Sequence, residues 1–274
     1  MALFNQHINP STLQLINYLL NLGDNALILG HKNSEWCGHG PVLEQDIAIT
    51  NISLDLIGQA RNFYQYAAKI INESKTPLLL KEKGLGDEVT EDHIAYLRDA
   101  VDFKNILLVE QPNGDWACTI LRQFLCSTYQ KLLYNGLLKS SNQQIAAISE
   151  KSLKEVNYHV KWSAEWVIRL GDGTVESRQH MLQAIDDLWM YTTELFEPTD
   201  YENWAAANNI GVDVSSLYGE WMQQVKNIFT EATLPIPEQQ GWQKGGKTGV
   251  HTEHLSYILT ALQYMQRAYP NCVW

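Results

Sequence analysis

The sequence predicts an all-α protein built on a bundle of long helices. Apolar residues recur at helical spacing over four long segments, and proline and glycine gather between these segments. A helix that is apolar over much of its surface needs neighbours on several sides. We therefore place residues 41–72 at the centre of a four-helix bundle. The stripe of this central helix consists of Ile49, Ile52, Leu56, Ala60, Phe63, Ala67 and Ile70.

The four bundle helices follow from the caps and breakers around each apolar segment. Ser11 can cap the first helix, which we expect Gly23 to interrupt near its middle. Residues 31–41 are rich in turn formers and short enough to make the first two helices antiparallel. Asp115 can cap the third helix. The four segments are residues 11–30, 41–72, 117–139 and 143–170.

Shorter helices are expected in the rest of the chain. Thr90, followed by two acidic residues, starts a short helix, and Pro112 ends another within residues 103–117. We see no convincing strand. One all-α domain over residues 1–274 is the expectation. Its carboxy-terminal helices are expected at residues 174–196, 213–232 and 250–268.

The charge balance argues against nucleic acid and anionic membranes as partners. The chain has 20 Lys and Arg against 31 Asp and Glu, a net charge of -11. Its four cysteines form no C-x-x-C pair, which favours buried free thiols over disulfides or zinc ligands. Residues 1–12 lack the pattern of a signal peptide, and no apolar run reaches the roughly 18 residues of a membrane span. We expect a cytoplasmic protein.

The bundle is short of metal ligands. A dimetal-carboxylate site needs a carboxylate from each of two helices and a Glu-x-x-His from each of the other two. Residues 117–139 contain no Asp or Glu, and the central helix has no histidine. In the fourth helix, His159 follows Val156 by three residues and Glu155 by four. One imidazole and a scattered carboxylate cannot hold two irons.

Five motifs occur in order along most of the chain. They are Leu22-Gly23-Asp24-Asn25, Glu35-Trp36-Cys37-Gly38-His39, Asp55-Leu56-Ile57-Gly58-Gln59-Ala60-Arg61-Asn62, Leu108-Val109-Glu110-Gln111-Pro112-Asn113-Gly114, and Gly245-Gly246-Lys247 with His251-Thr252-Glu253-His254-Leu255. The chain in this respect resembles the C subunits of bacterial phenylacetyl-CoA epoxidases, multicomponent monooxygenases of phenylacetate degradation. The resemblance implies a ferritin-like fold.

The resemblance also implies a subunit that has lost its metals. In the family, the A subunit shares the fold and carries a di-iron centre. Of the six positions that match its ligands, only His159 keeps a ligand here. Apolar and amide groups suit such a vestigial site, because buried carboxylates are costly without cations. The positions are Ala26, Leu56, Gln59, Cys126 (or the adjoining Ser127), Val156 and His159.

By resemblance, the chain would be a non-catalytic structural subunit without a cofactor of its own. It would pair with the A subunit through long helices, as a heterodimer or higher oligomer, shape the substrate channel from outside and form part of the reductase dock. In the family, a reductase with FAD and an iron–sulfur cluster supplies electrons, and the complex converts the CoA-activated ring to a 1,2-epoxide. A homodimer is an alternative when the chain is expressed alone.

Polar residues along the border of the central stripe are expected to form a buried hydrogen-bond network that fixes helix register. We interpret His159 as a core histidine bonded to a nearby carboxylate or amide rather than as a metal ligand. The expected members are Asp55, Gln59, Arg61, Asn62, Glu155 and His159.

The carboxy-terminal motif leaves several interpretations open. His251 and His254 are three residues apart, which can in principle bind zinc but lacks the i, i+4 pair of H-E-x-x-H sites. The alternative is helix capping, with Thr248 as the cap and Glu253 near the positive helix end. Two lysines between glycines could contact an acidic partner or a coenzyme A phosphate, or lie in a solvated loop. The candidate contacts are Lys244, Lys247, His251, Glu253 and His254.

Two other classes of function stay open. One is an independent enzyme with a mononuclear metal at His159, His251 and His254. The other is a helical module that binds another acyl-CoA.

Overall fold

The computed structural model describes residues 8–74, 88–239, 241–269 and 272. The signal-peptide prediction rests on residues 1–12, and residues 1–7 of this segment lie outside the described ranges. Within these ranges the protein has ten α-helices and no strand, which confirms the all-α prediction. None of the described helices is both long and apolar enough to cross a membrane. The helices are α1 (Pro10–Ser34), α2 (Leu43–Ser74), α4 (Glu91–Tyr96), α5 (Leu107–Glu110), α6 (Trp116–Leu137), α7 (Gln143–Gly171), α8 (Val175–Leu188), α9 (Asp200–Ala207), α10 (Tyr218–Glu231) and α11 (Glu253–Ala268).

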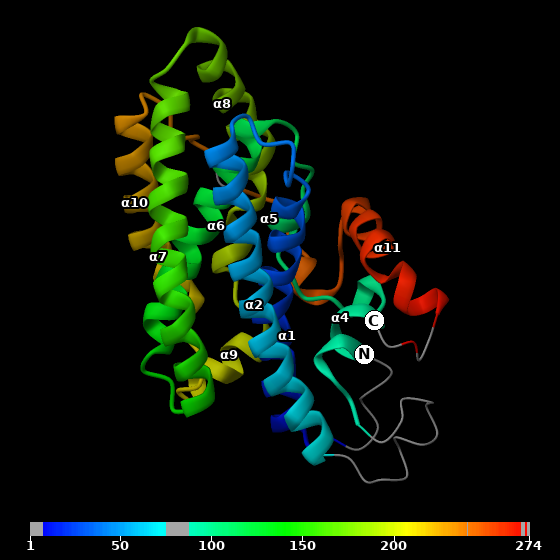
Figure 1. The fold of residues 1–274 in the computed structure, drawn as a ribbon. Coiled ribbons are helices and arrows are strands. Elements are labelled where there is room, and N and C mark those ends of the chain that lie inside the picture. Colours follow the sequence, from blue (N-terminus) through cyan, green and yellow to red (C-terminus); the bar gives the residue numbers. More distant parts are fainter. Residues whose placement is uncertain (1–7, 75–87, 240, 270–271, 273–274) are drawn as a thin grey trace.

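Four long helices pack side by side as two antiparallel pairs, α1 with α2 and α6 with α7 (Figure 1). Helix α2 also packs on α7 and so joins the two pairs. Helices α8 and α10 cover α6 and α7, and α9 packs on α1. Helix α11 packs on α4 and stands apart from α7 and α10, across α1 and α2 (Figure 1).

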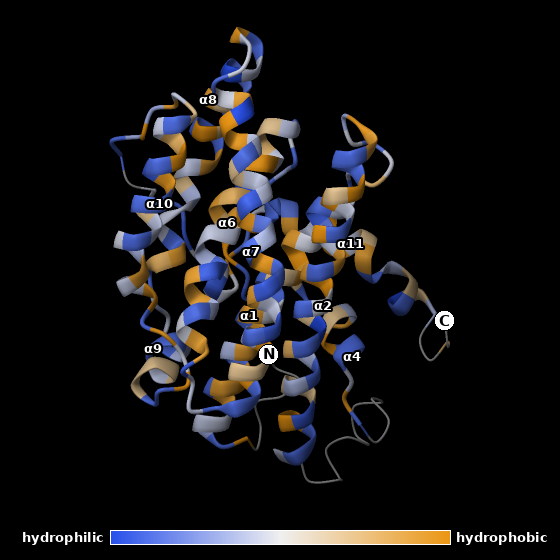
Figure 2. Ribbon diagram, turned by 60° about the vertical axis from the view of Figure 1, so that its left-hand side comes forward, coloured by the Kyte–Doolittle hydropathy of each residue, from blue (hydrophilic) through white to orange (hydrophobic). Residues whose placement is uncertain are grey.

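The helix at the centre is α6, so the prediction that residues 41–72 occupy it is wrong. Helix α6 buries 18 of its 22 residues, whereas α2 buries 13 of 32. The predicted apolar stripe of α2 is buried throughout, but Leu43, Ile47 and Leu54 on another face are exposed. Figure 2 shows hydrophilic and hydrophobic residues interleaved along this helix. Some of its apolar residues therefore face outward rather than into the core.

Helix α1 runs without a break through Gly23 and continues past the predicted end at residue 30. The glycine makes room for a neighbour, because a Cβ there would lie 2.5 Å from Cε1 of Tyr64. The prediction of an interruption is therefore wrong, and the reason for the glycine is close packing of α1 on α2.

The carboxy-terminal half departs most from the predicted boundaries. The helix expected over 174–196 ends at Leu188 and continues as two 3-10 turns. Helix α9 was not predicted, although Thr199 and Glu202 form a capping box at its start, a pattern visible in the sequence. The last helix begins at Glu253 instead of residue 250, with Thr252 at its N-cap position.

The four cysteines are free thiols, as the sequence predicts, but only two of them are buried. Cys118 and Cys126 lie inside α6, whereas Cys37 and Cys272 are exposed. The prediction of burial is therefore wrong for these last two. Cys37 lies in the turn-rich connection between α1 and α2, and Cys272 follows the last helix, so both lie outside the packed helices.

Candidate functional site

The six positions predicted to be vestigial lie on the four long helices, and all of them are buried. Three of them, Ala26, Leu56 and Val156, carry no metal-binding group. Burial raises the pKa of the Cys126 thiol to about 12, so this side chain stays neutral. Among the described residues, no group of three or more His, Cys, Asp and Glu side chains could hold a metal ion.

A chain of polar side chains connects α2, α6 and α7 at this level of the bundle. Nε2 of His159 lies 3.0 Å from Oδ2 of Asp55. The amide of Gln59 donates to Oε2 of Glu155 at 2.9 Å and accepts from the hydroxyl of Tyr134 at 3.3 Å. We call these five residues the α2–α7 polar group. The sequence analysis missed Tyr134, which lies on α6 about two helical turns after Cys126. No motif or spacing in the sequence pointed to this tyrosine.

The α2–α7 polar group opens to solvent at one end. His159 and Gln59 are buried, whereas Glu155 is half-buried and the side chain of Asp55 is 36% exposed. Burial raises the pKa of Glu155, the hydrogen bond from Gln59 lowers it, and the charge of Asp55 raises it further, with a net increase. Two carboxylates thus approach each other at the surface between α2 and α7.

Two of the predicted network members lie elsewhere. The side chain of Arg61 is 67% exposed and pairs with Glu91 at 3.2 Å. It lies roughly 200° around the helix from Gln59, because each residue turns the helix by about 100°. Asn62 is half-buried, and no hydrogen bond of the polar group involves it among the described residues. The prediction that Arg61 is a buried network member is wrong.

Exposed apolar residues lie on another face of α2 and on α7. Leu43, Ile47 and Leu54, which we call the α2 outer stripe, are followed by Tyr158 on α7. The ring of Tyr158 lies 6.4 Å from that of His159, and Leu54 precedes Asp55 in the chain. Aromatic and aliphatic residues around a few polar groups are typical of a protein–protein interface.

Lys247 does not face solvent, a partner or a coenzyme A phosphate, so that prediction is wrong. Its side chain is 4% exposed, and Nζ lies 2.9 Å from Oε1 of Glu202. Nζ also donates to the carbonyls of Leu195 and Glu197. The preceding Gly246 packs so closely that a Cβ would collide with the carbonyl oxygen of Asn105. The glycine therefore serves packing of the chain on itself.

His251 is likewise an internal contact. Nδ1 lies 2.8 Å from Oε2 of Glu110, and Nε2 lies 3.0 Å from the carbonyl oxygen of Phe103. With both ring nitrogens occupied, His251 is not free to act as a zinc ligand. The predicted capping role of Thr248 is wrong, because α11 starts five residues later and Thr248 belongs to a 3-10 turn, Gly246–Thr248.

The remaining candidate contacts lie at or near the surface. Lys244 is exposed and pairs with the exposed Glu197 at 3.0 Å. Glu253 is exposed at the start of α11. His254 is half-buried, and its ring lies 6.3 Å from that of Tyr257. The motif thus divides into internal residues and surface residues.

A second buried cluster holds residues 98–106 against α1. Asp24 accepts from both Nη atoms of Arg98, at 3.0 and 2.5 Å, and from the hydroxyl of Tyr64 at 2.5 Å. It also accepts from the backbone N–H of Lys104 at 2.7 Å. Asp24 and Glu110 each belong to one of the five motifs, which was the one signal for them in the sequence. Nothing in the sequence singled out Arg98.

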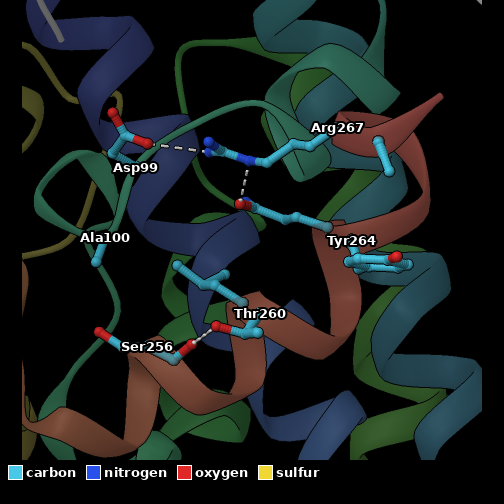
Figure 3. Close-up of a pocket in the computed structure, with 9 residues that line it drawn as sticks. Asp99, Ala100, Ser256, Thr260, Tyr264 and Arg267 are labelled. Carbon is cyan, nitrogen blue, oxygen red and sulfur yellow. Dashed lines mark hydrogen bonds and ion pairs between the residues drawn. The ribbon is translucent and has the colours of Figure 1, made fainter. Parts of the chain in front are cut away.

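An open groove of about 560 Å³ lies between α11 and residues 99–100 (Figure 3). Arg267 spans it at one end, where Nη2 lies 3.0 Å from Oδ1 of Asp99. Thr260 donates to the carbonyl oxygen of Ser256 within the same helix (Figure 3). These polar groups of the groove bond to one another, and its lining is mainly apolar.

Comparison with known proteins places this arrangement in a family. A family model described as "Phenylacetic acid catabolic protein" matches residues 4–274. The chain belongs to this family. Among phenylacetic acid catabolic proteins, the C subunit of the 1,2-phenylacetyl-CoA epoxidase of Escherichia coli (strain K12) is 45% identical over 261 residues, or 95% of this chain and 99% of that relative. The family resemblance predicted from the five motifs is confirmed.

Proposed function

We propose that this chain is the non-catalytic structural subunit, of the C type, of a multicomponent 1,2-phenylacetyl-CoA epoxidase in aerobic phenylacetate catabolism. The observation that carries the proposal is the 45% identity, over nearly the whole of both chains, to the C subunit of such an enzyme. In this proposal the chain is a single ferritin-like domain in the cytoplasm. It supports a catalytic A subunit that holds the di-iron centre.

The interior of the bundle supports the non-catalytic part of the proposal. The vestigial positions present alkyl groups, an amide, a neutral thiol and one imidazole. The imidazole of His159 is already bonded to Asp55. Oxygen activation would then belong to the A subunit, and FAD and iron–sulfur chemistry to the reductase of the complex.

The α2 outer stripe supports pairing through the long helices. Leu54, 62% exposed, lies midway along α2 and directly precedes Asp55 in the chain. Burial of such apolar side chains is the main favourable term in stable protein association. We therefore propose that the A subunit docks on the face of α2 that carries this stripe.

Co-expression with an A-type subunit tests the proposal. We expect the two chains to co-purify and the mixture to epoxidise phenylacetyl-CoA when the reductase and the remaining subunits are present. The purified chain alone should contain no stoichiometric iron and show no oxygenase activity. Two irons per chain, or turnover of the thioester by the isolated polypeptide, would contradict the non-catalytic assignment.

A matched pair of variants tests the position of the interface. Leu54→Asp places a charge in the α2 outer stripe and should abolish co-purification with the A subunit. Val175→Asp places the same charge on α8, at a residue that is 83% exposed, and should leave co-purification unchanged. Equal retention of both variants would move the interface away from α2.

A further inference from the structure

The hydrogen bonds of His251 fix the protonation state of its ring. A backbone carbonyl only accepts hydrogen bonds, so Nε2, 3.0 Å from the oxygen of Phe103, carries a proton. Glu110 accepts from Asn105 Nδ2 at 2.9 Å and from the N–H and hydroxyl of Thr252 at 2.7 and 2.8 Å. A carboxylate that accepts from so many donors is ionised, so Nδ1 also donates to it. The ring is an imidazolium.

This contact attaches the start of α11 to the core. The side chain of His251 is 4% exposed and that of Glu110 is 0% exposed. The far part of α11 is held differently, because Gln263 and Arg267 donate to backbone carbonyls of residues 95 and 98. Of these contacts, the one between His251 and Glu110 is therefore the one that depends on protonation of the histidine ring.

The groups around His251 favour the charged ring. Burial by itself lowers the pKa of His251, but the hydrogen bond and charge of Glu110, the carbonyl of Phe103 and the charge of Asp24 outweigh it and raise the pKa. Asp24 is itself paired with Arg98. The other charged or titratable groups nearby are Asp102 and Lys104, on either side of Phe103 in the chain, Glu253 and His254 on α11, and Tyr191. The charge of Glu110 contributes to raising the pKa of Tyr191.

We propose that Glu110 and His251 form a proton-dependent latch that holds α11 on the bundle while the ring is an imidazolium and loosens α11 when the ring loses a proton. After deprotonation, one ring nitrogen presents a lone pair either to the Glu110 carboxylate or to the Phe103 carbonyl, and that contact becomes repulsive. The groove in Figure 3 is formed by α11 and residues 99–100, so it exists only while α11 is docked.

The direction of the pH dependence follows from linkage. A histidine whose pKa is raised in the folded state adds stability that is fully present below the unfolded value of about 6.5. This stability is lost as pH rises through the folded pKa. The latch is therefore closed below the unfolded value and opens as pH rises through the raised pKa of the folded state.

Hydrogen exchange of the full-length chain across this pH range, corrected for intrinsic exchange rates, tests the latch. We expect protection of α11 to fall about tenfold for each pH unit by which the folded pKa exceeds the unfolded one, while protection of α6 stays constant. His254→Gln, which removes a histidine three residues away, should behave as the parent. His251→Gln should show low α11 protection without a pH step, and Glu110→Gln should move the step to lower pH.

The proposal is overturned if α11 protection in the parent has no pH step, or if His251→Gln retains the step. Should His251→Gln fail to fold, as loss of α6 protection would show, the titration of the parent's histidine side chains by NMR decides. A histidine with protons on both ring nitrogens and a pKa above 6.5 that shifts down in Glu110→Gln supports the latch. Absence of such a histidine refutes it.

Discussion

His159 and His251 are both buried imidazoles bonded to a carboxylate, but their carboxylates lie in different surroundings. Asp55, the partner of His159, is 36% exposed at the edge of α2, whereas Glu110, the partner of His251, is 0% exposed. Glu110 also accepts from Asn105 and Thr252. The exposure of the carboxylate, rather than that of the histidine, separates an internal attachment from a contact at the protein surface.

The largest effect is expected at the internal pair. Glu110→Ala leaves the His251 cation and the donors of Asn105 and Thr252 buried without an acceptor, which should lower the free energy of unfolding by about 4 kcal/mol. Urea denaturation measures this loss. Glu253→Ala, at an exposed carboxylate near the same helix start, should change it by less than about 0.5 kcal/mol. Similar losses of unfolding free energy in Glu110→Ala and Glu253→Ala would show that burial of the carboxylate does not decide the effect.

A second buried pair extends the comparison to lysine. Lys247→Ala leaves Glu202 buried without its cation and should destabilise the chain by about 3 kcal/mol. Lys244→Ala, three residues earlier in the same loop, removes an exposed lysine whose carboxylate partner is also exposed, and should have an effect below about 0.5 kcal/mol. Thermal unfolding of the two variants side by side gives the result, and a smaller loss at Lys247 than at Lys244 would contradict it.

The pair at the surface, Asp55 and His159, should behave in the opposite way. Asp55→Asn removes a charge that water already screens, so the loss in unfolding free energy should be about 0.5 kcal/mol. If this surface lies under the A subunit, the same variant should weaken co-purification with it, because the charge lies inside the interface. A loss of stability equal to that of Glu110→Ala would show that both pairs are internal.

The smallest effect is expected at Glu155. Its raised pKa means that the ionised form is disfavoured in the folded state, so the penalty is absent below the ordinary value near 4.5 and fully present above the raised one. Glu155→Gln keeps an oxygen for the amide of Gln59 and removes the charge. We expect a gain of at most about 0.5 kcal/mol at pH 7 and none at pH 4, measured by urea denaturation. A clear loss at pH 7 would contradict the sign.

Periodicity in the sequence predicted the apolar face of α2 that is buried. It did not predict toward which neighbour the other faces of this helix point. The stripe from Ile49 to Ile70 is buried as predicted, but Leu54 could not be distinguished from a core residue, because apolarity does not tell which face has a neighbour. Arg61 was grouped with Gln59 by closeness in sequence, although helical geometry turns it to another side. A bond of His159 to a nearby carboxylate was predicted, and Asp55 was one of the expected members of the network.

Long-range partners could not be predicted from one sequence. Glu110 and His251 are 141 positions apart, and Asp24 and Arg98 are 74 apart. The motifs signalled a role for Asp24, Glu110 and His251, but the pairing depends on how α5, α11 and the loops pack. For the same reason, Lys247 was taken for a surface residue, although Glu202 lies 45 positions earlier in the chain and neutralises it.

The hydrogen bonds that residues 245–252 donate to buried carboxylates have a consequence for synthesis of the chain. Residues 245–252 supply donors to Glu110, Glu194 and Glu202, all of which leave the ribosome earlier. A polypeptide released before residue 245 would bury these carboxylates without those donors or expose them to water. A chain without residues 245–252 should therefore be less stable than the full chain.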